Sequence, residues 1–293
     1  MVCFVVLHYM VVEETKKCIE SIQRINGEKK IIIVDNASGN GSGLEIQQMY
    51  KNDNDIEVII NEKNLGFANG NNIGYQKALI YNPDFIVVMN NDIEITQEDF
   101  IERVNNTYNE EKFAVLGPNI YSTTAQIHQS PKRLSSYTFD EVKGLLKEYE
   151  FRKKSKIIVP MKCFFKKLKI LKLLVFKDRE KKSGIDYNKK YYNVPLHGSF
   201  VIFSKDFLKV REYAFNKGTF MYYEMEILDY ECKLNNLKEV YDPSIKILHH
   251  HSASSNKTFG SELKKVRFMN NCIYDSLNVF LDDINKSKKG EEV

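Results

Sequence analysis

The sequence predicts an α/β fold in which a mostly parallel sheet is flanked by helices on both faces. Two observations lead to this prediction. Short runs of apolar and β-branched residues alternate with segments whose apolar residues recur at helical spacing. The apolar runs are also continuous rather than interrupted by polar residues, which is typical of strands that are buried on both faces of a parallel sheet.

The first 120 residues carry this pattern. The first apolar run, residues 2–7, is followed by apolar residues at helical spacing as far as Ile25. The second run, 30–34, stops at DNASG, a sequence that favours a turn. Further strands are expected at 56–60, 85–89 and 114–120, and the helices between them at 44–50, from a Gly/Asn-rich turn to about 80, and at 97–108.

Polar residues follow four of these strands where each strand ends. They are His8 with Tyr9, Asp35 with Asn36, the run 61–64, and the triplet Asn90, Asn91 and Asp92. Turn formation explains any one of these groups. Four groups at one edge indicate more, because ligands of parallel α/β sheets bind beyond the carboxyl ends of the strands. We therefore expect a binding site at this edge.

Composition and charge narrow the class of protein. The chain has 293 residues, of which 43% are hydrophobic and 28% are charged, as in an ordinary globular protein. A net charge of +4 is too small to indicate nucleic acid as a partner. The five cysteines lack metal-ligand spacing and are expected to be buried. Neither a signal peptide nor an apolar run of about 20 residues is found, so we expect a cytoplasmic protein.

Four motifs in a fixed order connect the sequence to a known family. They are VVLHY from residue 5, VDNAS from residue 34, NLGFANGNNIG from residue 64 and MNND from residue 89. In order and spacing they resemble the family 2 glycosyltransferases, and among these the rhamnosyltransferase-like branch of bacterial surface and capsular polysaccharide synthesis. The resemblance covers most of the chain except about 125–190. It implies a GT-A fold, a UDP- or TDP-sugar donor, inversion at the anomeric carbon and a saccharide acceptor that we expect to be lipid-linked.

The resemblance and the charge pattern together divide the chain into four parts. These are a nucleotide-sugar-binding half at 1–124, a basic and partly helical insert at 125–190, an acceptor and catalytic half at 191–258, and a C-terminal helix with its tail at 259–293.

The resemblance also indicates a set of donor-binding residues. Asp35 matches the family's nucleoside-binding acid, with a turn cap as the alternative role for this carboxylate. Gly66 opens a helix whose N-terminus favours a phosphate or sugar oxygen. Asn69 and Asn72 share one helix face, with helix capping as the alternative role for their amides. The full donor set is His8, Tyr9, Asp35, Asn64, Gly66, Phe67, Asn69, Asn72, Asn90, Asn91, Asp92, Gly198 and Ser199.

A divalent metal is expected beside the donor diphosphate. Asp92 matches the last acid of the family's Asp-X-Asp motif, which binds this metal. Because Asn90 replaces the first acid, the metal would rely on phosphate oxygens and water, as Mg²⁺ commonly does. The family's strand-end histidine falls in the run HHHS, where the register favours His249 as a metal ligand and His251 next. We therefore expect Mg²⁺ or Mn²⁺, with a separate zinc site on the histidines as the alternative.

The catalytic base is expected at an acidic helix start. Residues 219–228 resemble the family segment in which an acid deprotonates the acceptor hydroxyl. The family usually shows two adjacent acids, but here Met225 takes the second place. The match indicates Glu224, with Glu226 in reserve. The two side chains face different directions on a helix, so only one is expected to enter the pocket.

Two further segments indicate additional partners for the protein. Residues 152–182 hold most of the positive excess and contain an apolar stripe from Met161 to Val175 with lysines opposite. Such a basic amphipathic helix can lie on an anionic membrane, or else pack on the domain with a solvated lysine face. Residues 261–283 predict a C-terminal helix that packs on the catalytic half or on a second subunit of a homodimer.

Two other classes of protein stay open beside an inverting glycosyltransferase. A nucleotidyltransferase usually carries a Gly-rich, Arg-containing loop after its first strand, where this chain has His8, Tyr9 and Met10. A non-catalytic GT-A-like subunit that binds a partner transferase or the membrane is indicated by Asn90 and Met225 in otherwise acidic motifs. We favour the transferase.

Overall fold

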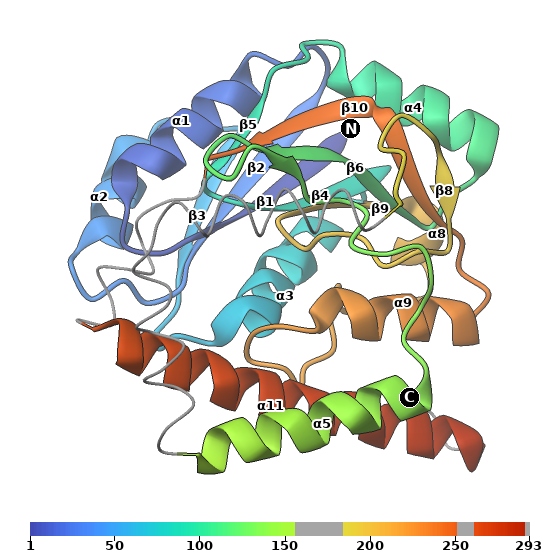
Figure 1. Cartoon of the computed structure of the whole chain (residues 1–293). Coiled ribbons are helices and arrows are strands. Elements are labelled where there is room, and N and C mark those ends of the chain that lie inside the picture. Colours follow the sequence, from blue (N-terminus) through green and yellow to red (C-terminus); the bar gives the residue numbers. More distant parts are fainter. Residues whose placement is uncertain (156–183, 251–260, 291–293) are drawn as a thin grey trace.

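The computed structural model describes residues 1–155, 184–250 and 261–290, which form an α/β fold around one mixed sheet (Figure 1). Strands and helices alternate from the first residues onward, as predicted. The elements of this half are β1 (Val2–His8), α1 (Val12–Gln23), β2 (Lys29–Asp35), α2 (Ser42–Met49), β3 (Ile56–Ile60), α3 (Gly66–Leu79), β4 (Phe85–Asn90), β5 (Ile93–Ile95), α4 (Phe100–Glu111) and β6 (Val115–Ser122).

The later part of the chain completes the sheet and adds two long helices. Its elements are β7 (Ile127–His128), α5 (Phe139–Lys154), β8 (Tyr191–Tyr192), β9 (Phe200–Ser204), α8 (Lys205–Leu208), α9 (Glu224–Leu234), β10 (Glu239–His249) and α11 (Glu262–Lys288). The basic amphipathic stripe predicted between Met161 and Val175 lies outside the described residues. Within the described ranges, no helix combines the length and the apolar composition needed to cross a bilayer.

The sheet is parallel in its first half and mixed beyond it. Its main path runs β3-β2-β1-β4-β9-β6-β10-β5, and the pairs from β3 to β4 are all parallel. Strand β9 then lies antiparallel between β4 and β6, and β5 pairs antiparallel with β10. The α/β prediction is confirmed. The strands β5, β7 and β8 were not predicted, because two or three residues cannot show a hydrophobic period.

Each face of the sheet carries its own apolar cluster. Alternate residues of β1 point to opposite faces. Phe4 packs with α1 and α4 on one face, while Val5 packs with α3 and α9 on the other. The contact of α3 is close, since a Cβ atom added at Gly74 would lie 2.3 Å from a methyl group of Val5. Four cysteines are buried in the structure as expected, namely Cys3, Cys18, Cys232 and Cys272.

A third apolar cluster joins the two long helices to α9. Helices α5 and α11 lie side by side below the sheet in Figure 1. The cluster between them contains Val142, Leu277, Phe280 and Ile284, and it also takes in Ile227 of α9. A capping box between Thr138 and Glu141 fixes the start of α5. The predicted C-terminal helix is therefore present, and it packs on α5 and on the helix that begins at Glu224.

Candidate active site

The polar strand ends meet at one edge of the sheet. In the strand register His8 lies opposite Asp35, Leu7 lies opposite Asn90, and Asp35 lies opposite Ile60. The expectation that these groups share the carboxyl edge of the parallel strands is confirmed. The individual side chains differ, however, in whether they face an open site or the interior.

His8 supports the site from within. Its side chain is buried, and its two ring nitrogens lie 2.7 Å from the Thr15 hydroxyl and 2.9 Å from the Ser42 hydroxyl. Burial lowers the pKa of His8 to about 4, so the imidazole is neutral. Thr15 in turn accepts a hydrogen bond from the Asn91 amide. Both ring nitrogens are therefore occupied within the protein, and through Thr15 the imidazole connects β1 with the Asn-Asn-Asp triplet. The contact of His8 with a donor stays a prediction. Tyr9, the next residue, is half-buried.

The Asp35 carboxylate caps the turn that follows β2. Both of its oxygens accept from the Ser38 N–H, at 3.3 and 3.2 Å. The chain then passes close over it, since a Cβ atom added at Gly43 would lie 2.3 Å from an Asp35 oxygen. This is the turn-cap role that the sequence left open.

Asn36 organises the start of α3, a role that the sequence did not indicate. Its side-chain oxygen accepts from the Asn61 amide and from the Leu65 N–H, at 3.3 and 2.9 Å. Its amide nitrogen donates to the Asn64 side chain and to the Gly66 carbonyl, at 3.1 and 2.9 Å. The only signal in the sequence is its place directly after Asp35. The Asn64 side-chain oxygen thus accepts a hydrogen bond from Asn36, and it also accepts one from the Gly66 N–H.

The asparagines of α3 bind protein backbone rather than an open pocket. Asn72 donates to the Phe215 carbonyl and accepts from the Phe215 N–H, at 2.8 and 3.0 Å. Asn69 donates to the Lys217 carbonyl at 3.0 Å. Both amides thus bond to backbone groups far along the chain, and their assignment to the donor stays a prediction.

Gly66 and Phe67 contact the same distant segment. Gly66 has a left-handed backbone with φ of 78°, and a Cβ atom there would lie 2.1 Å from the Phe220 carbonyl oxygen. The Phe67 N–H donates to that oxygen at 2.6 Å, and the Phe67 ring packs on Phe215. The NLGFANGNN motif thus holds residues 215–220, which lead directly into α9.

Asp92 and His249 lie together although they are far apart in the chain. The Asp92 Oδ1 atom is 3.2 Å from His249 Nε2, and the other ring nitrogen of His249 lies 2.7 Å from the Gln129 side-chain oxygen. Both Asp92 and His249 are buried. The pairing predicted for these two residues is present. Among the described residues, no group of three or more acids, cysteines or histidines is arranged to hold a metal ion. His251, the second choice, lies outside the described residues.

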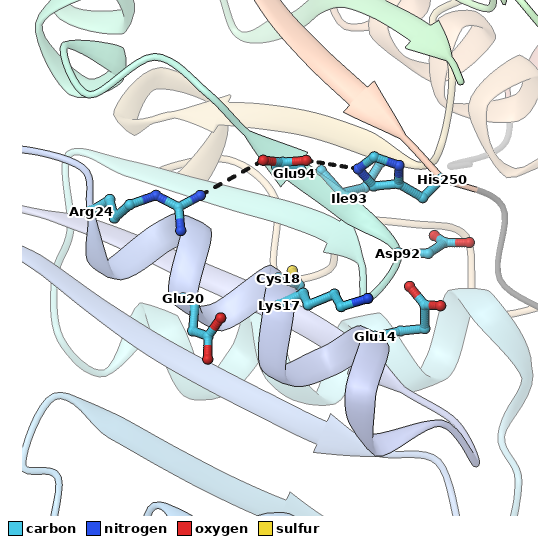
Figure 2. Close-up of a pocket in the computed structure, with 9 residues that line it drawn as sticks. All are labelled: Glu14, Lys17, Cys18, Glu20, Arg24, Asp92, Ile93, Glu94 and His250. Carbon is cyan, nitrogen blue, oxygen red and sulfur yellow. Dashed lines mark hydrogen bonds and ion pairs between the residues drawn. The ribbon is translucent and has the colours of Figure 1, made fainter. Parts of the chain in front are cut away.

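A pocket of 370 Å³ opens beside Asp92, between α1 and β5 (Figure 2). The residues that line it are Glu14, Lys17, Cys18, Glu20, Arg24, Asp92, Ile93, Glu94 and His250. Figure 2 shows Glu94 between Arg24 and His250, with a Glu94–His250 contact of 2.8 Å and a Glu94–Arg24 contact of 3.8 Å. This charged group joins α1, β5 and the end of β10 around the pocket.

Glu224 is the first residue of α9 and is placed by an unusual backbone. The two residues before it, Tyr222 and Tyr223, are both left-handed, with φ of 76° and 66°. Such backbone strain in non-glycine residues is concentrated at functional sites. Glu224 is buried, and its Oε1 atom has no hydrogen-bond partner within the described chain. The pKa of Glu224 is raised to about 7, mainly by burial; the nearby charge of Glu226 acts in the same direction, while backbone hydrogen bonds and Lys132 act against it.

Glu226 differs from Glu224 in having a cation beside it. Its Oε1 atom accepts from the Lys132 ammonium at 2.9 Å. The two acids therefore have different environments, since Glu226 is in an ion pair and the Oε1 atom of Glu224 has no hydrogen-bond partner within the described chain.

Residues 197–199 connect the two acidic regions. The Ser199 carbonyl accepts from the Asn90 N–H at 2.9 Å, and the His197 ring lies 6.0 Å from the His249 ring. A Cβ atom added at Gly198 would lie 3.3 Å from the Met225 side chain. This small-residue segment therefore reaches from the Asp92–His249 pair to the start of α9. The Ser199 hydroxyl is buried and bonds to His197 at 2.9 Å.

The sequence match decides the family. Residues 3–173 match the family model described as Glycosyl transferase family 2. The chain belongs to this family. A comparison of this family 2 chain with curated protein sequences finds no match.

Solved structures agree with a GT-A fold for the family 2 chain. S. aureus TarS 1–349 is similar with a TM-score of 0.53 and 14% identity over 92% of this chain and 65% of that one. Its complex with UDP gives 0.53 and 13% over the same shares. Full TarS gives 0.53 and 13% over 90% of this chain and 41% of that one. The chain thus spans less than two thirds of these proteins, and at such identity the likeness shows the fold alone.

Proposed function

We propose that this family 2 protein is an inverting glycosyltransferase. It would move a sugar from a UDP- or TDP-sugar to a saccharide acceptor, expected to be lipid-linked, in the synthesis of a bacterial surface polysaccharide. Family membership supports sugar transfer, and one of the similar structures is a complex with UDP. The resemblance to the rhamnosyltransferase-like branch supports the pathway.

The observation that carries the proposal is the state of Glu224. A general base works best when its pKa lies near the working pH, and burial brings the pKa of Glu224 to about 7. In the proposed reaction Glu224 takes the proton of the acceptor hydroxyl. The hydroxyl oxygen then forms a bond to the anomeric carbon as the bond from that carbon to the diphosphate oxygen breaks. The nucleoside diphosphate leaves from the opposite face, which inverts the anomeric centre.

Asp92 and His249 are the residues that would hold a metal. A carboxylate oxygen and an imidazole nitrogen 3.2 Å apart at the sheet edge suit Mg²⁺ or Mn²⁺ if phosphate oxygens and water complete the coordination. Such an ion, when bound, would offset the charge that develops on the leaving diphosphate. The hydrogen bonds that join His8 to Thr15 and Thr15 to Asn91 orient the loop that carries Asp92.

The second candidate is a non-catalytic GT-A-like subunit that binds a partner transferase or the membrane. The shortage of acidic residues in the motifs favours this candidate, because Asn90 and Met225 occupy positions that are usually acidic. Met225 is buried in the apolar cluster against α3, so this position faces the core rather than a ligand. Its substitution therefore removes no carboxylate from the pocket, which weakens the case for this candidate.

A donor screen separates the two candidates. The melting temperature would be measured with UDP, TDP and GDP, each with and without Mg²⁺ or Mn²⁺. Metal-dependent stabilisation by one diphosphate is expected for a transferase, and purified sugar donors on a synthetic lipid-linked acceptor would then identify the product. If no nucleotide changes the melting temperature, the transferase proposal fails and the partner-subunit candidate is favoured.

A further inference from the structure

A small polar pocket lies where the end of α5 meets the first turns of α11, the two helices at the bottom of Figure 1. Its volume is 120 Å³, well below the roughly 300–1,000 Å³ of pockets for drug-sized ligands. The described residues that line it are Arg152, Lys153, Ser155, Arg267, Asn270 and Asn271. All of them carry hydrogen-bond donors and none of them is an acid, so the lining suits one small anionic group.

Asn270 shows that the pocket is more than a gathering of surface charges. The residue is only 9% exposed, and it lines the pocket. Its amide makes no hydrogen bond to the described chain. The atoms of this amide are not among the fully enclosed polar atoms that lack a partner, so the amide opens onto the pocket. A ligand that accepts hydrogen bonds can bind to it there.

Two of the three cations of the pocket are ion-paired with acids outside its lining, and the third is not. Arg152 bonds to Glu148, and Lys153 lies 3.7 Å from Asp275, yet neither acid lines the pocket. Arg267 is exposed and has no ion pair with any described residue. Its guanidinium therefore has donors available to an anion.

The helix dipoles do not explain this arrangement. Cations at the end of α5 are favourable there in any case, because the dipole places negative charge at a helix C-terminus. The first two turns of α11 carry Glu262, which the dipole favours, but also Lys264, Lys265 and Arg267, which it disfavours. Of these, Arg267 lines the pocket and adds a cation from α11 to the two from α5.

We propose that this pocket binds a phosphate group, carried either by a membrane lipid headgroup or by a free phosphorylated compound. Guanidinium and amide groups bind the oxygens of a phosphate through short, charge-assisted hydrogen bonds. Neither α5 nor α11 contributes a residue to the candidate active site. The inference therefore does not rest on the proposed transferase activity, and the two can fail separately.

The test compares two pocket variants with a matched control. Arg267→Glu reverses a charge at an exposed position, and Asn270→Leu removes the amide at nearly constant size. Lys51→Glu is the control, because Lys51 is an exposed residue after α2 without an ion pair in the described chain, and its substitution changes the net charge equally. Circular dichroism would confirm that each variant is folded.

Two arms distinguish the source of the phosphate. In the first, the dissociation constant of inorganic phosphate is measured by ³¹P NMR in metal-free buffer. In the second, the full chain is floated with vesicles of phosphatidylcholine, with and without phosphatidylglycerol. Arg267→Glu and Asn270→Leu are expected to weaken at least one of these interactions about tenfold, and Lys51→Glu less than about twofold.

The outcomes are separable. A loss in the phosphate arm identifies a free phosphate as the ligand, and a loss confined to the vesicle arm identifies a lipid headgroup. If Arg267→Glu and Lys51→Glu weaken both interactions equally, only the net charge matters and the proposal is overturned. Absence of binding in both arms for the unmodified protein would overturn it as well.

Discussion

At the scale of single residues, the pKa of Glu224 makes a direct prediction about the rate of transfer. Only the carboxylate form can accept the acceptor proton, and burial places its pKa at about 7. The value of kcat/KM should therefore rise with pH through a midpoint near 7. Glu226→Gln should lower this midpoint and Lys132→Met should raise it, since they remove a negative and a positive charge beside Glu224. A pH–rate profile of the three proteins is the measurement, and a shift of both variants in one direction would exclude Glu224.

The same pKa predicts a pH-dependent stability effect of Glu224→Gln. The pKa of this carboxyl is about 7 in the native state against 4.5 ordinarily, so between these pH values the native state holds more protons than the unfolded chain. Native stability therefore falls as pH rises from 4.5 to 7 and then levels off. Glu224→Gln should match the wild type at pH about 4 and exceed it by about 3 kcal/mol at pH 8.

Urea unfolding at the two pH values would measure this difference. The variant should also lose transfer while it keeps nucleotide binding, so lost activity could not be ascribed to unfolding. A variant that is less stable at both pH values would show instead that Glu224 has a structural role.

At the scale of elements, the close contact of α3 with residues 215–220 predicts the effect of Gly66→Ala. The added methyl group would meet the Phe220 carbonyl oxygen at 2.1 Å in a left-handed backbone, so the segment before Glu224 must shift. We expect a loss of about 1–3 kcal/mol in stability and a fall in kcat that exceeds any loss of UDP binding.

Gly39→Ala is the matched control, since a Cβ atom at Gly39 would meet nothing within 4 Å. It should leave both stability and kcat unchanged. Calorimetric UDP binding and single-turnover transfer would be measured for both variants. If Gly66→Ala lost UDP binding and turnover equally, the start of α3 would contact the donor and would not act through the segment before Glu224.

These contacts also show what the sequence could and could not predict. Continuous apolar strands predicted the parallel half, and motif order predicted that Asp92 would meet His249. The family resemblance assigned Asn69 and Asn72 to the donor. In the structure their amides bond to the backbone of Lys217 and Phe215, which are more than 140 residues away in the chain. A local pattern identifies a side chain that needs a partner, but not whether that partner is a ligand or distant backbone.

At the scale of the whole molecule, the third apolar cluster connects the C-terminal helix to α9, the helix that begins at Glu224. Phe280 of α11 is fully buried in this cluster, which also includes Ile227 of α9 and the Tyr223 side chain beside Glu224. Phe280→Ala should cost about 3–5 kcal/mol of stability through the cavity that it leaves. It should also lower kcat, because the helix that positions Glu224 loses its support, while UDP binding at the sheet edge is retained.

Phe151→Ala makes the same chemical change on α5 at a side chain that is 63% exposed, so it should alter neither quantity appreciably. Urea unfolding, UDP titration and turnover would be compared for the two variants at a temperature where both are folded. If Phe280→Ala lost stability but kept its full kcat, the base would be positioned by the sheet and by residues 215–220 alone. A fall in kcat without a change in UDP affinity would instead show that the helix pair α5–α11 is part of the machinery that holds Glu224 against its acceptor.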